Sequence, residues 1–228
     1  MNLYLTTIDM NMTEDILQNR MSLLCANRLK KVLACKLKED RIRSVSAGLL
    51  MQKGLATYRK SCCAEELPRD ENGILLIEIA ETQRGKPYFA EYPWIKFSIA
   101  HSGKMVGCVF GEAEVGLDIQ EKRPCNHEKL IRRFHEKEQK KYYSLSGEDA
   151  ETYFFRLWTA KEAYVKYTGN GLFEDFSSFY VDLDEGTVCK NGSDITTRVQ
   201  EIQVVEEGYY CMLAFEIEQK LHTFIEKI

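Results

Sequence analysis

Hydrophobic and polar positions along the chain follow two periods, one typical of strands and one typical of helices. Residues 2–8 alternate with a period of two and predict a short strand. Helix-forming residues dominate 27–60, where Ile42, Val45 and Leu49 recur every three to four positions as an apolar stripe. Further strands are predicted at 73–80, 95–100, 105–110, 115–120, 179–183, 196–205 and 209–217, and further helices at 124–143 and 156–171.

These elements alternate irregularly, without the repeated strand–helix order of a parallel α/β sheet. The predicted fold class is therefore α+β with antiparallel sheets. The short polar segment 111–114 marks the predicted division between an N-terminal half, 1–112, and a C-terminal half, 113–228.

Composition excludes several classes of protein. The 228-residue chain has a net charge of -4, which argues against a nucleic-acid partner, because binding to a phosphate backbone rests on an excess of lysine and arginine. Its eight cysteines and four histidines include no C-x-x-C pair, so no zinc site is predicted. No apolar run approaches the ~18 residues of a membrane span and the first residues lack a signal-peptide pattern. We therefore expect a cytoplasmic protein without a membrane partner.

The predicted helix 156–171 carries a row of functional side chains. Trp158, Glu162 and Lys166 follow one another at i, i+4 spacing and share one helix face. Such a row can hold a divalent cation at the carboxylate and an anionic oxygen at the ammonium. For an isolated pair at this spacing, an ordinary surface ion pair is the better interpretation.

The predicted strand 115–120 supplies possible partners for that helix. Its apolar residues share one face, and Gly116, Asp118 and Gln120 share the other. Asp118 and Gln120 present oxygen ligands for a hard cation, and Glu162 would complete a set of three. Alone, the alternation is more typical of an ordinary half-exposed strand.

Candidate anion-binding residues are spread over the N-terminal half. They are Arg28, Lys31, Arg43 and Ser44 in the first helical region, and Lys86 and His101 on turns beside strands. Each is ordinary by itself. A fold that brings them together would form a pocket for a ligand with more than one phosphate.

Five motifs occur in a characteristic order. They are Gly-Lys-Pro at 85–87, Phe-Ser-Ile-Ala-His-Ser at 97–102, Gly-Leu-Asp-Ile at 116–119, Phe-His at 134–135 followed by Glu138, and Trp-Thr-Ala-Lys-Glu-Ala at 158–163 followed by Lys166 and Gly169. In this order and spacing they resemble the Sfp-type 4'-phosphopantetheinyl transferases. The resemblance covers roughly the middle third of the chain, and the run of motifs is far more specific than any single one.

The resemblance implies two similar-sized α/β halves related by a pseudo-twofold, with the active site in the cleft between them and the protein a monomer. It implies Mg²⁺-dependent transfer of the phosphopantetheine arm of coenzyme A to a serine of an acyl or peptidyl carrier protein. The other product would be adenosine 3',5'-bisphosphate. The N-terminal half would contact coenzyme A, and the C-terminal half would hold the metal and receive the carrier.

The resemblance also implies roles for individual residues, matched by position. Asp118, Gln120 and Glu162 would be metal ligands; Asp118, Lys161, Glu162 and Lys166 catalytic residues; and Arg28, Lys31, Arg43, Ser44, Lys86, Pro87, His101 and Lys166 contacts to the cofactor. Within that last set, Lys86 and Pro87 would lie by the adenine and Lys166 would reach the pyrophosphate. Glu162 is the nearest candidate base for the serine proton, directly or through a metal-bound water.

Two residues depart from the family pattern. Gln120 stands where many members have a second acid, and Ala100 stands where a serine is common. These changes keep open an alternative, a non-catalytic module that binds coenzyme A or the carrier. A different Mg²⁺-dependent phosphotransferase would need a G-x-x-x-x-G-K-[ST] loop, which this sequence lacks.

Two stretches are candidates for docking the carrier. One is the basic run 122–141, whose apolar residues include Leu130 and Phe134, and the other is 172–176 with its two phenylalanines. A solvated helix face is an equally good interpretation of the first.

Overall fold

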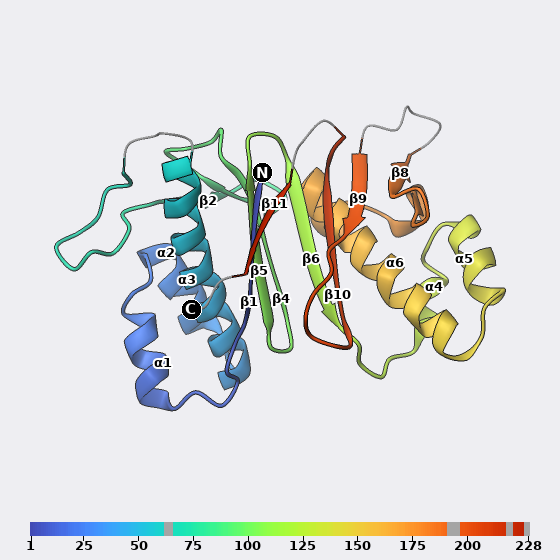
Figure 1. Ribbon diagram of the computed structural model, residues 1–228, viewed down its shortest axis with the longest axis horizontal. Helices are drawn as coiled ribbons and strands as arrows, with labels where there is room; N and C mark the ends of the chain where they lie inside the picture. Colours follow the sequence, from blue (N-terminus) through green and yellow to red (C-terminus); the bar gives the residue numbers. More distant parts are fainter. Residues whose placement is uncertain (62–65, 191–196, 218–220, 226–228) are drawn as a thin grey trace. The chain divides into compact units, whose positions relative to one another are not determined.

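The computed structural model describes residues 1–61, 66–190, 197–217 and 221–225. These residues form two compact units (Figure 1). The first contains the described parts of 1–82 and 87–113 together with the C-terminal strand, and the second contains 83–86 and the described parts of 114–217. Each unit has its own buried core.

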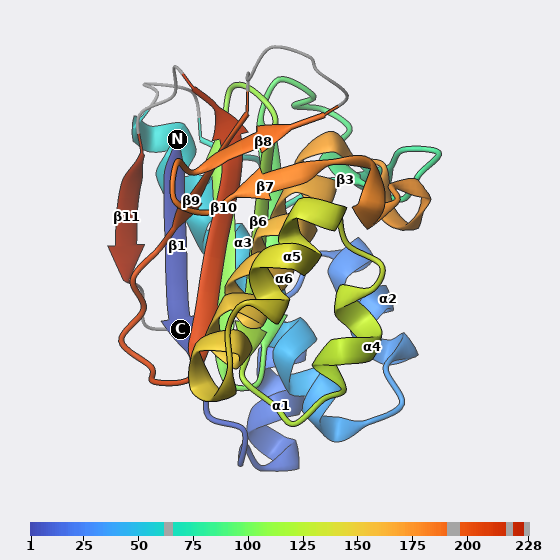
Figure 2. The same ribbon diagram turned by 90° about the vertical axis from the view of Figure 1, so that its right-hand side faces the viewer.

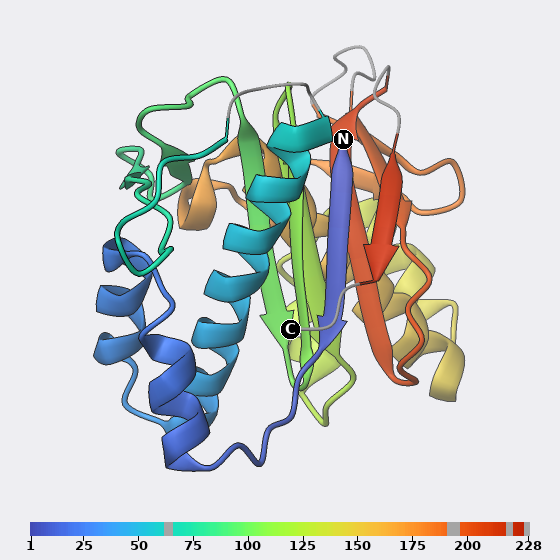
Figure 3. The ribbon, with the colours of Figure 1, turned by 60° about the vertical axis from the view of Figure 1, so that its left-hand side comes forward.

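The first unit is a four-stranded sheet covered by helices. Its elements are β1 (Asn2–Thr7), α1 (Glu14–Met21), α2 (Ala26–Ala34), α3 (Lys38–Ser61), β2 (Ile79–Glu81), β3 (Pro87–Phe89), β4 (Lys96–Ser102), β5 (Met105–Gly111) and β11 (His222–Ile225). The sheet order is β11-β1-β5-β4, with β11 parallel to β1 and the other pairs antiparallel. The long helix α3 runs along this sheet and buries Val45, Met51 and Leu55 against it (Figure 3).

The second unit is a five-stranded sheet with one long helix across it. Its elements are β6 (Val115–Glu121), α4 (His127–Ile131), α5 (Glu136–Tyr143), α6 (Gly147–Thr168), the 3-10 turns η1 (Gly171–Phe173) and η2 (Phe176–Ser178), β7 (Tyr180–Asp182), β8 (Thr187–Cys189), β9 (Thr197–Glu201) and β10 (Tyr209–Glu216). The order is β6-β10-β9-β8-β7, all antiparallel. Helix α6 packs against β6 and β10 (Figure 2).

The predicted α+β fold class is confirmed, but several predicted elements differ. The helical region 27–60 is two helices, α2 and α3, and the charged stretch 124–143 is also two, α4 and α5. In the second case the chain breaks because His135, in extended conformation, caps a new helix. The pseudo-twofold relation of the halves and the location of the active site between them stay predictions.

The predicted strand 73–80 is mostly not a strand. Ile79–Glu81 pairs with β3 as β2, and Leu75 forms an isolated bridge with Arg69. Leu75 and Ile77 are buried while Leu76 is 54% exposed, so the segment alternates between buried and exposed side chains and is not the largely buried strand that its run of apolar residues predicts. The carboxylate of Asp70 accepts hydrogen bonds from the backbone of Asn72 and Ile74, which builds a turn in place of a long ladder.

The two units depart from the predicted halves at two segments. Residues 83–86 belong with the second unit, because the Lys86 ammonium is bound there by Glu114 and the Tyr167 carbonyl. The C-terminal strand β11 pairs with β1 and thus belongs with the first unit. Every helix in the described part of the chain falls short of the length or hydropathy that membrane crossing requires.

Candidate functional site

The predicted strand and helix of the second unit meet at Asp118. This carboxylate on β6 is only 4% exposed. Its Oδ1 accepts a hydrogen bond from Lys166 Nζ on α6 at 2.7 Å, and its Oδ2 accepts one from Gln120 Nε2 at 2.8 Å. Three of the predicted site residues are therefore in direct contact.

Gly116 explains why the helix comes this close. A Cβ added there would lie 2.0 Å from the Ala163 carbonyl oxygen and 2.4 Å from the Tyr167 nitrogen, both backbone atoms of α6. Ala163 and Ala214, which flank the contact, are fully buried. The glycine two positions before Asp118 is thus a packing requirement that allows α6 to reach β6.

Glu162 joins this group from one turn earlier on α6. Burial raises the pKa of its carboxyl, and the neighbouring Asp118 raises it further, whereas Lys166 lowers it. Two carboxylates that repel each other beside a single lysine have the charge to attract a cation. Asp118, Gln120 and Glu162 offer only oxygen ligands to it, as hard cations prefer.

The predicted metal ligands Asp118, Gln120 and Glu162 include only two carboxylates. In the described ranges, no three His, Cys, Asp or Glu residues cluster as metal ligands would. Asp118 and Glu162 supply the two carboxylates, and Gln120 supplies one amide oxygen. A Mg²⁺ bound to these three residues would complete its coordination shell with oxygens of water or substrate. Such a composition fits a metal that is held jointly with a phosphate ligand.

Lys161 does not belong to this group, which corrects its prediction as a catalytic residue. Its ammonium is fully buried, 2.9 Å from Glu138 Oε2, and donates to the carbonyls of Phe176 and Phe179 at 2.8 Å each. Burial lowers the pKa of Lys161 to about 8 and raises the pKa of Glu138, while the contact between the two opposes both shifts. A side chain enclosed in this way does not touch substrate.

Lys86 also has contacts that its predicted place beside the adenine does not explain. Its Nζ donates to Glu114 Oε2 at 2.5 Å and to the Tyr167 carbonyl at 2.8 Å. The stem of Lys86 lies against Gly169, which ends α6 in the left-handed conformation with φ 70°. Lys86 therefore anchors the C-terminus of the helix that carries Glu162.

In the first unit, Arg28 and Ser44 are brought together. Arg28 is 9% exposed and donates from Nη2 to the Ser44 carbonyl at 3.1 Å, while its buried Nε has no hydrogen-bond partner. No carboxylate pairs with Arg28 among the residues that the structure describes. Burial lowers the pKa of Arg28. An uncompensated buried cation is costly, and an anion bound beside it would offset that cost.

The other predicted contacts of this unit are arranged differently. Lys31 forms an ion pair with Glu81 at 2.6 Å, and Arg43 forms one with Asp40 at 2.6 Å. Pro87 lies opposite Glu81 in the β2–β3 ribbon. His101 is exposed on β4. The structure thus links Lys31 to Pro87 through Glu81.

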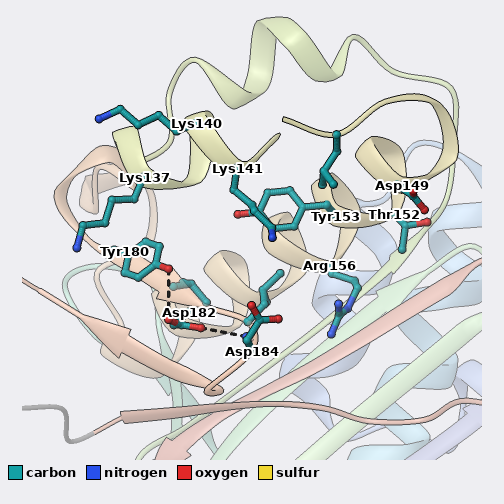
Figure 4. A pocket seen from close by; sticks show the side chains of 13 residues that line it. Lys137, Lys140, Lys141, Asp149, Thr152, Tyr153, Arg156, Tyr180, Asp182 and Asp184 are labelled. Carbon is teal, nitrogen blue, oxygen red and sulfur yellow. Dashed lines mark hydrogen bonds between the residues drawn. The ribbon is translucent and has the colours of Figure 1, made fainter. Parts of the chain in front are cut away.

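A hollow of about 660 Å³ lies elsewhere in the second unit, between α5, α6 and β7 (Figure 4). Its lining includes Lys137, Lys140 and Lys141, and it also includes Asp182 and Asp184. None of the predicted site residues lines it. The lysines belong to the predicted docking run 122–141, so part of that run faces a mixed-charge hollow.

Sequence reasoning missed the contact network around Glu138. The His135 side chain accepts from the Lys137 nitrogen, and Glu138 Oε2 accepts from the His135 nitrogen, which together form a capping box. The sequence does contain a signal for this capping box, since an acid three positions after a capping residue marks a helix start. The ion pair to Lys161 had no such local signal.

Comparison with known proteins places the chain in a family. Residues 114–214 match the 4'-phosphopantetheinyl transferase superfamily. The 4'-phosphopantetheinyl transferase gsp of Aneurinibacillus migulanus is 30% identical over 175 residues, which cover 76% of this chain and 68% of that protein. The 4'-phosphopantetheinyl transferase Sfp of Bacillus subtilis is 27% identical over 81% of this chain and 78% of that protein.

Other relatives match over shorter stretches. The 4'-phosphopantetheinyl transferase psf-1 of Bacillus pumilus is 39% identical over 108 residues, so the match spans 46% of that protein. A solved holo-[acyl-carrier-protein] synthase of Thermotoga maritima overlaps at a TM-score of 0.36 and 18% identity, over 45% of this chain and 61% of that chain, which is too little for an argument about fold. The matched region contains Asp118, Glu162 and Lys166, and the gsp match extends over most of both proteins. The chain belongs to the 4'-phosphopantetheinyl transferase superfamily.

Proposed function

We propose that this protein transfers the 4'-phosphopantetheine arm of coenzyme A to a serine hydroxyl of an acyl or peptidyl carrier protein, with adenosine 3',5'-bisphosphate as the second product. Family membership supports the reaction class. The observation that carries the proposal is the convergence of Asp118, Glu162 and Lys166 in the matched region.

The reaction is proposed to need Mg²⁺, which Asp118 and Glu162 would hold with help from Gln120. When bound, the cation neutralises charge on the pyrophosphate and polarises its oxygens. Gln120 hydrogen-bonds to Asp118 through its amide, so it orients that carboxylate even without a charge of its own. This contact supports function despite the departure from the family pattern.

Lys166 is proposed to bind the pyrophosphate. Its side chain is 34% exposed while Asp118 holds the ammonium at 2.7 Å. A lysine with one donor fixed has two donors left for phosphate oxygens. Because the ammonium is oriented in advance, it stabilises the charge that develops on the leaving oxygens at little further cost.

Glu162 is proposed to accept the proton from the carrier serine. Burial and the neighbouring Asp118 raise the pKa of this carboxyl, whereas a Mg²⁺ held at Glu162 would lower it, so the proposed role rests on the position of Glu162 beside Asp118 and Lys166. The serine oxygen would then form a bond to the β-phosphorus while the bond from that phosphorus to the bridging oxygen breaks. The released adenosine 3',5'-bisphosphate takes that oxygen with it.

The first unit is proposed to contact the nucleotide part of coenzyme A. Arg28 is the residue best supported for the 3'-phosphate, because its guanidinium is buried with an orphaned Nε. Ser44 and His101 are proposed to assist it, and Pro87 to lie by the adenine. Lys31 and Arg43 would have to exchange their carboxylate partners for phosphate oxygens. We further propose a cytoplasmic monomer that acts without nucleic acid or membrane.

A matched pair of variants tests the function. The wild-type protein is incubated with coenzyme A, Mg²⁺ and several apo acyl and peptidyl carriers, and mass spectrometry detects the added arm. Glu162→Gln should abolish the mass gain. Glu151→Gln is the control, because Glu151 lies on the same helix but pairs with Lys122 at 2.7 Å. If calorimetry detects binding of coenzyme A but no carrier gains mass, the protein would be a non-catalytic binding module.

A further inference from the structure

We propose that the buried ion pair between Glu138 and Lys161 is a positioning device that sets the rotation of α6 and thereby the place of Glu162. The inference rests on the proposed function. Neither member of the pair touches substrate. Their role would be to hold the helix, and their removal should affect turnover more than binding.

All three N–H donors of the Lys161 ammonium have acceptors. An ammonium has three protons to donate. Those of Lys161 are directed at Glu138 Oε2, the Phe176 carbonyl and the Phe179 carbonyl, at 2.8–2.9 Å. Helix α6 is thus connected at this residue to α5 and to both ends of the turn before β7.

The Glu138 carboxylate also accepts hydrogen bonds from two backbone nitrogens. Its Oε1 accepts from the Val181 nitrogen on β7 at 2.7 Å, and its Oε2 accepts from the His135 nitrogen at 3.0 Å. Both members of the pair are fully buried. One ion pair therefore joins α5, α6 and β7 through directional bonds.

Aromatic rings enclose the charges. The Lys161 Nζ lies 3.9 Å from the centre of the Phe179 ring and 5.4 Å from that of Phe134. Such an apolar shell excludes water and makes displacement of either charge costly. Stability alone does not explain the pair, since apolar residues of similar volume in place of a buried ion pair often stabilise a protein equally well. What an apolar pair lacks is the fixed geometry of the hydrogen bonds.

That geometry bears directly on the site because Lys161 immediately precedes Glu162. Side chains on a helix lie about 5–6 Å from its axis, so a rotation of about 10° moves a carboxylate by about 1 Å. A displacement of this size costs about 100-fold in rate. The pair fixes one side of α6, and the contact of Gly116 with Ala163 and Tyr167 fixes another.

The test separates positioning from stability with three variants. Lys161→Met and Glu138→Leu each leave one charge buried without its partner, so each should lower the urea midpoint of unfolding. The double variant Lys161→Met with Glu138→Leu should recover most of that midpoint. We expect its kcat to stay about 100-fold below wild type, with KM for coenzyme A within about threefold.

Two further proteins complete the test. Arg156→Met with Glu201→Leu removes a partly exposed ion pair from the same helix and should retain wild-type kcat. Lys161→Arg with Glu138→Asp keeps both charges but changes their reach, so it should fold and still lose kcat.

The outcomes decide between two explanations. Wild-type kcat in either folded double variant at Glu138 and Lys161 overturns the inference, and so does failure of both to fold, since the pair would then act through stability alone. Absence of transfer by the wild-type protein would instead refute the proposed function. A structural role without positioning would lower the midpoint and leave kcat unchanged.

Discussion

Replacing Gly116 with alanine tests how β6 and α6 together build the site. The added methyl would lie 2.0 Å from the Ala163 carbonyl oxygen, where ordinary contacts are 3.4 Å or longer. The atoms in its way are helix backbone, so no side chain can rotate aside. The φ angle of Gly116 is not in the left-handed region, and crowding is therefore the whole effect. Because real Cβ atoms essentially never come closer than 3.0 Å to a neighbouring atom, helix α6 must move away from β6 by about 1 Å or more.

Two consequences of this movement can be estimated. Crowding inside a packed core costs about 1–3 kcal/mol of unfolding free energy. The movement also stretches the 2.7 Å contact between Asp118 and Lys166 and shifts Glu162. A displacement of about 1 Å lowers turnover by about 100-fold. The loss in kcat should therefore be large even in a protein that is still mostly folded.

Urea unfolding and kcat for transfer to an apo carrier, measured on the same preparation, check the estimate. Gly147→Ala is the control: at φ 56° with no atom within 4 Å of an added Cβ, it brings backbone strain without crowding. It should cost about 1–2 kcal/mol and leave kcat unchanged. A Gly116→Ala protein with a wild-type urea midpoint and kcat within threefold of wild type would refute the reasoning.

Two other predictions concern charged groups. Arg28→Met should keep or raise the melting temperature, because it removes a buried cation that has no carboxylate partner in the described ranges, while KM for coenzyme A rises by about tenfold or more. A clear fall in melting temperature with unchanged KM would contradict this. Burial raises the pKa of Glu174, but hydrogen bonds from Lys190 and Asn170 outweigh it and hold that pKa below 4.5. The unfolded chain thus binds the proton more readily, so this contribution to stability is present above pH 4.5 and is lost as pH falls through the folded pKa. Glu174→Gln should make the acid side of the stability profile shallower, and an unchanged profile would count against the contact.

The sequence was sufficient for the fold class and for the contact between two of the predicted site residues, Asp118 and Lys166. The period-two alternation of 115–120 put Gly116, Asp118 and Gln120 on one face, and the i, i+4 spacing put Glu162 and Lys166 on another. These are local properties of a strand and a helix. The order of motifs then indicated that the two elements meet, as the hydrogen bond between Asp118 and Lys166 confirms.

Contacts between elements distant in the sequence were decided only by the tertiary structure. Lys161 and Lys166 lie on one helix and both were predicted to be catalytic, yet one is enclosed with Glu138 and the other stays partly exposed beside Asp118. Likewise, periodicity does not reveal that β11 pairs with β1. Local spacing determines which side chains share a face of an element. Which face becomes core, and which buried charge finds a partner there, depends on how elements pack, because only packing removes the water that would otherwise solvate each charge.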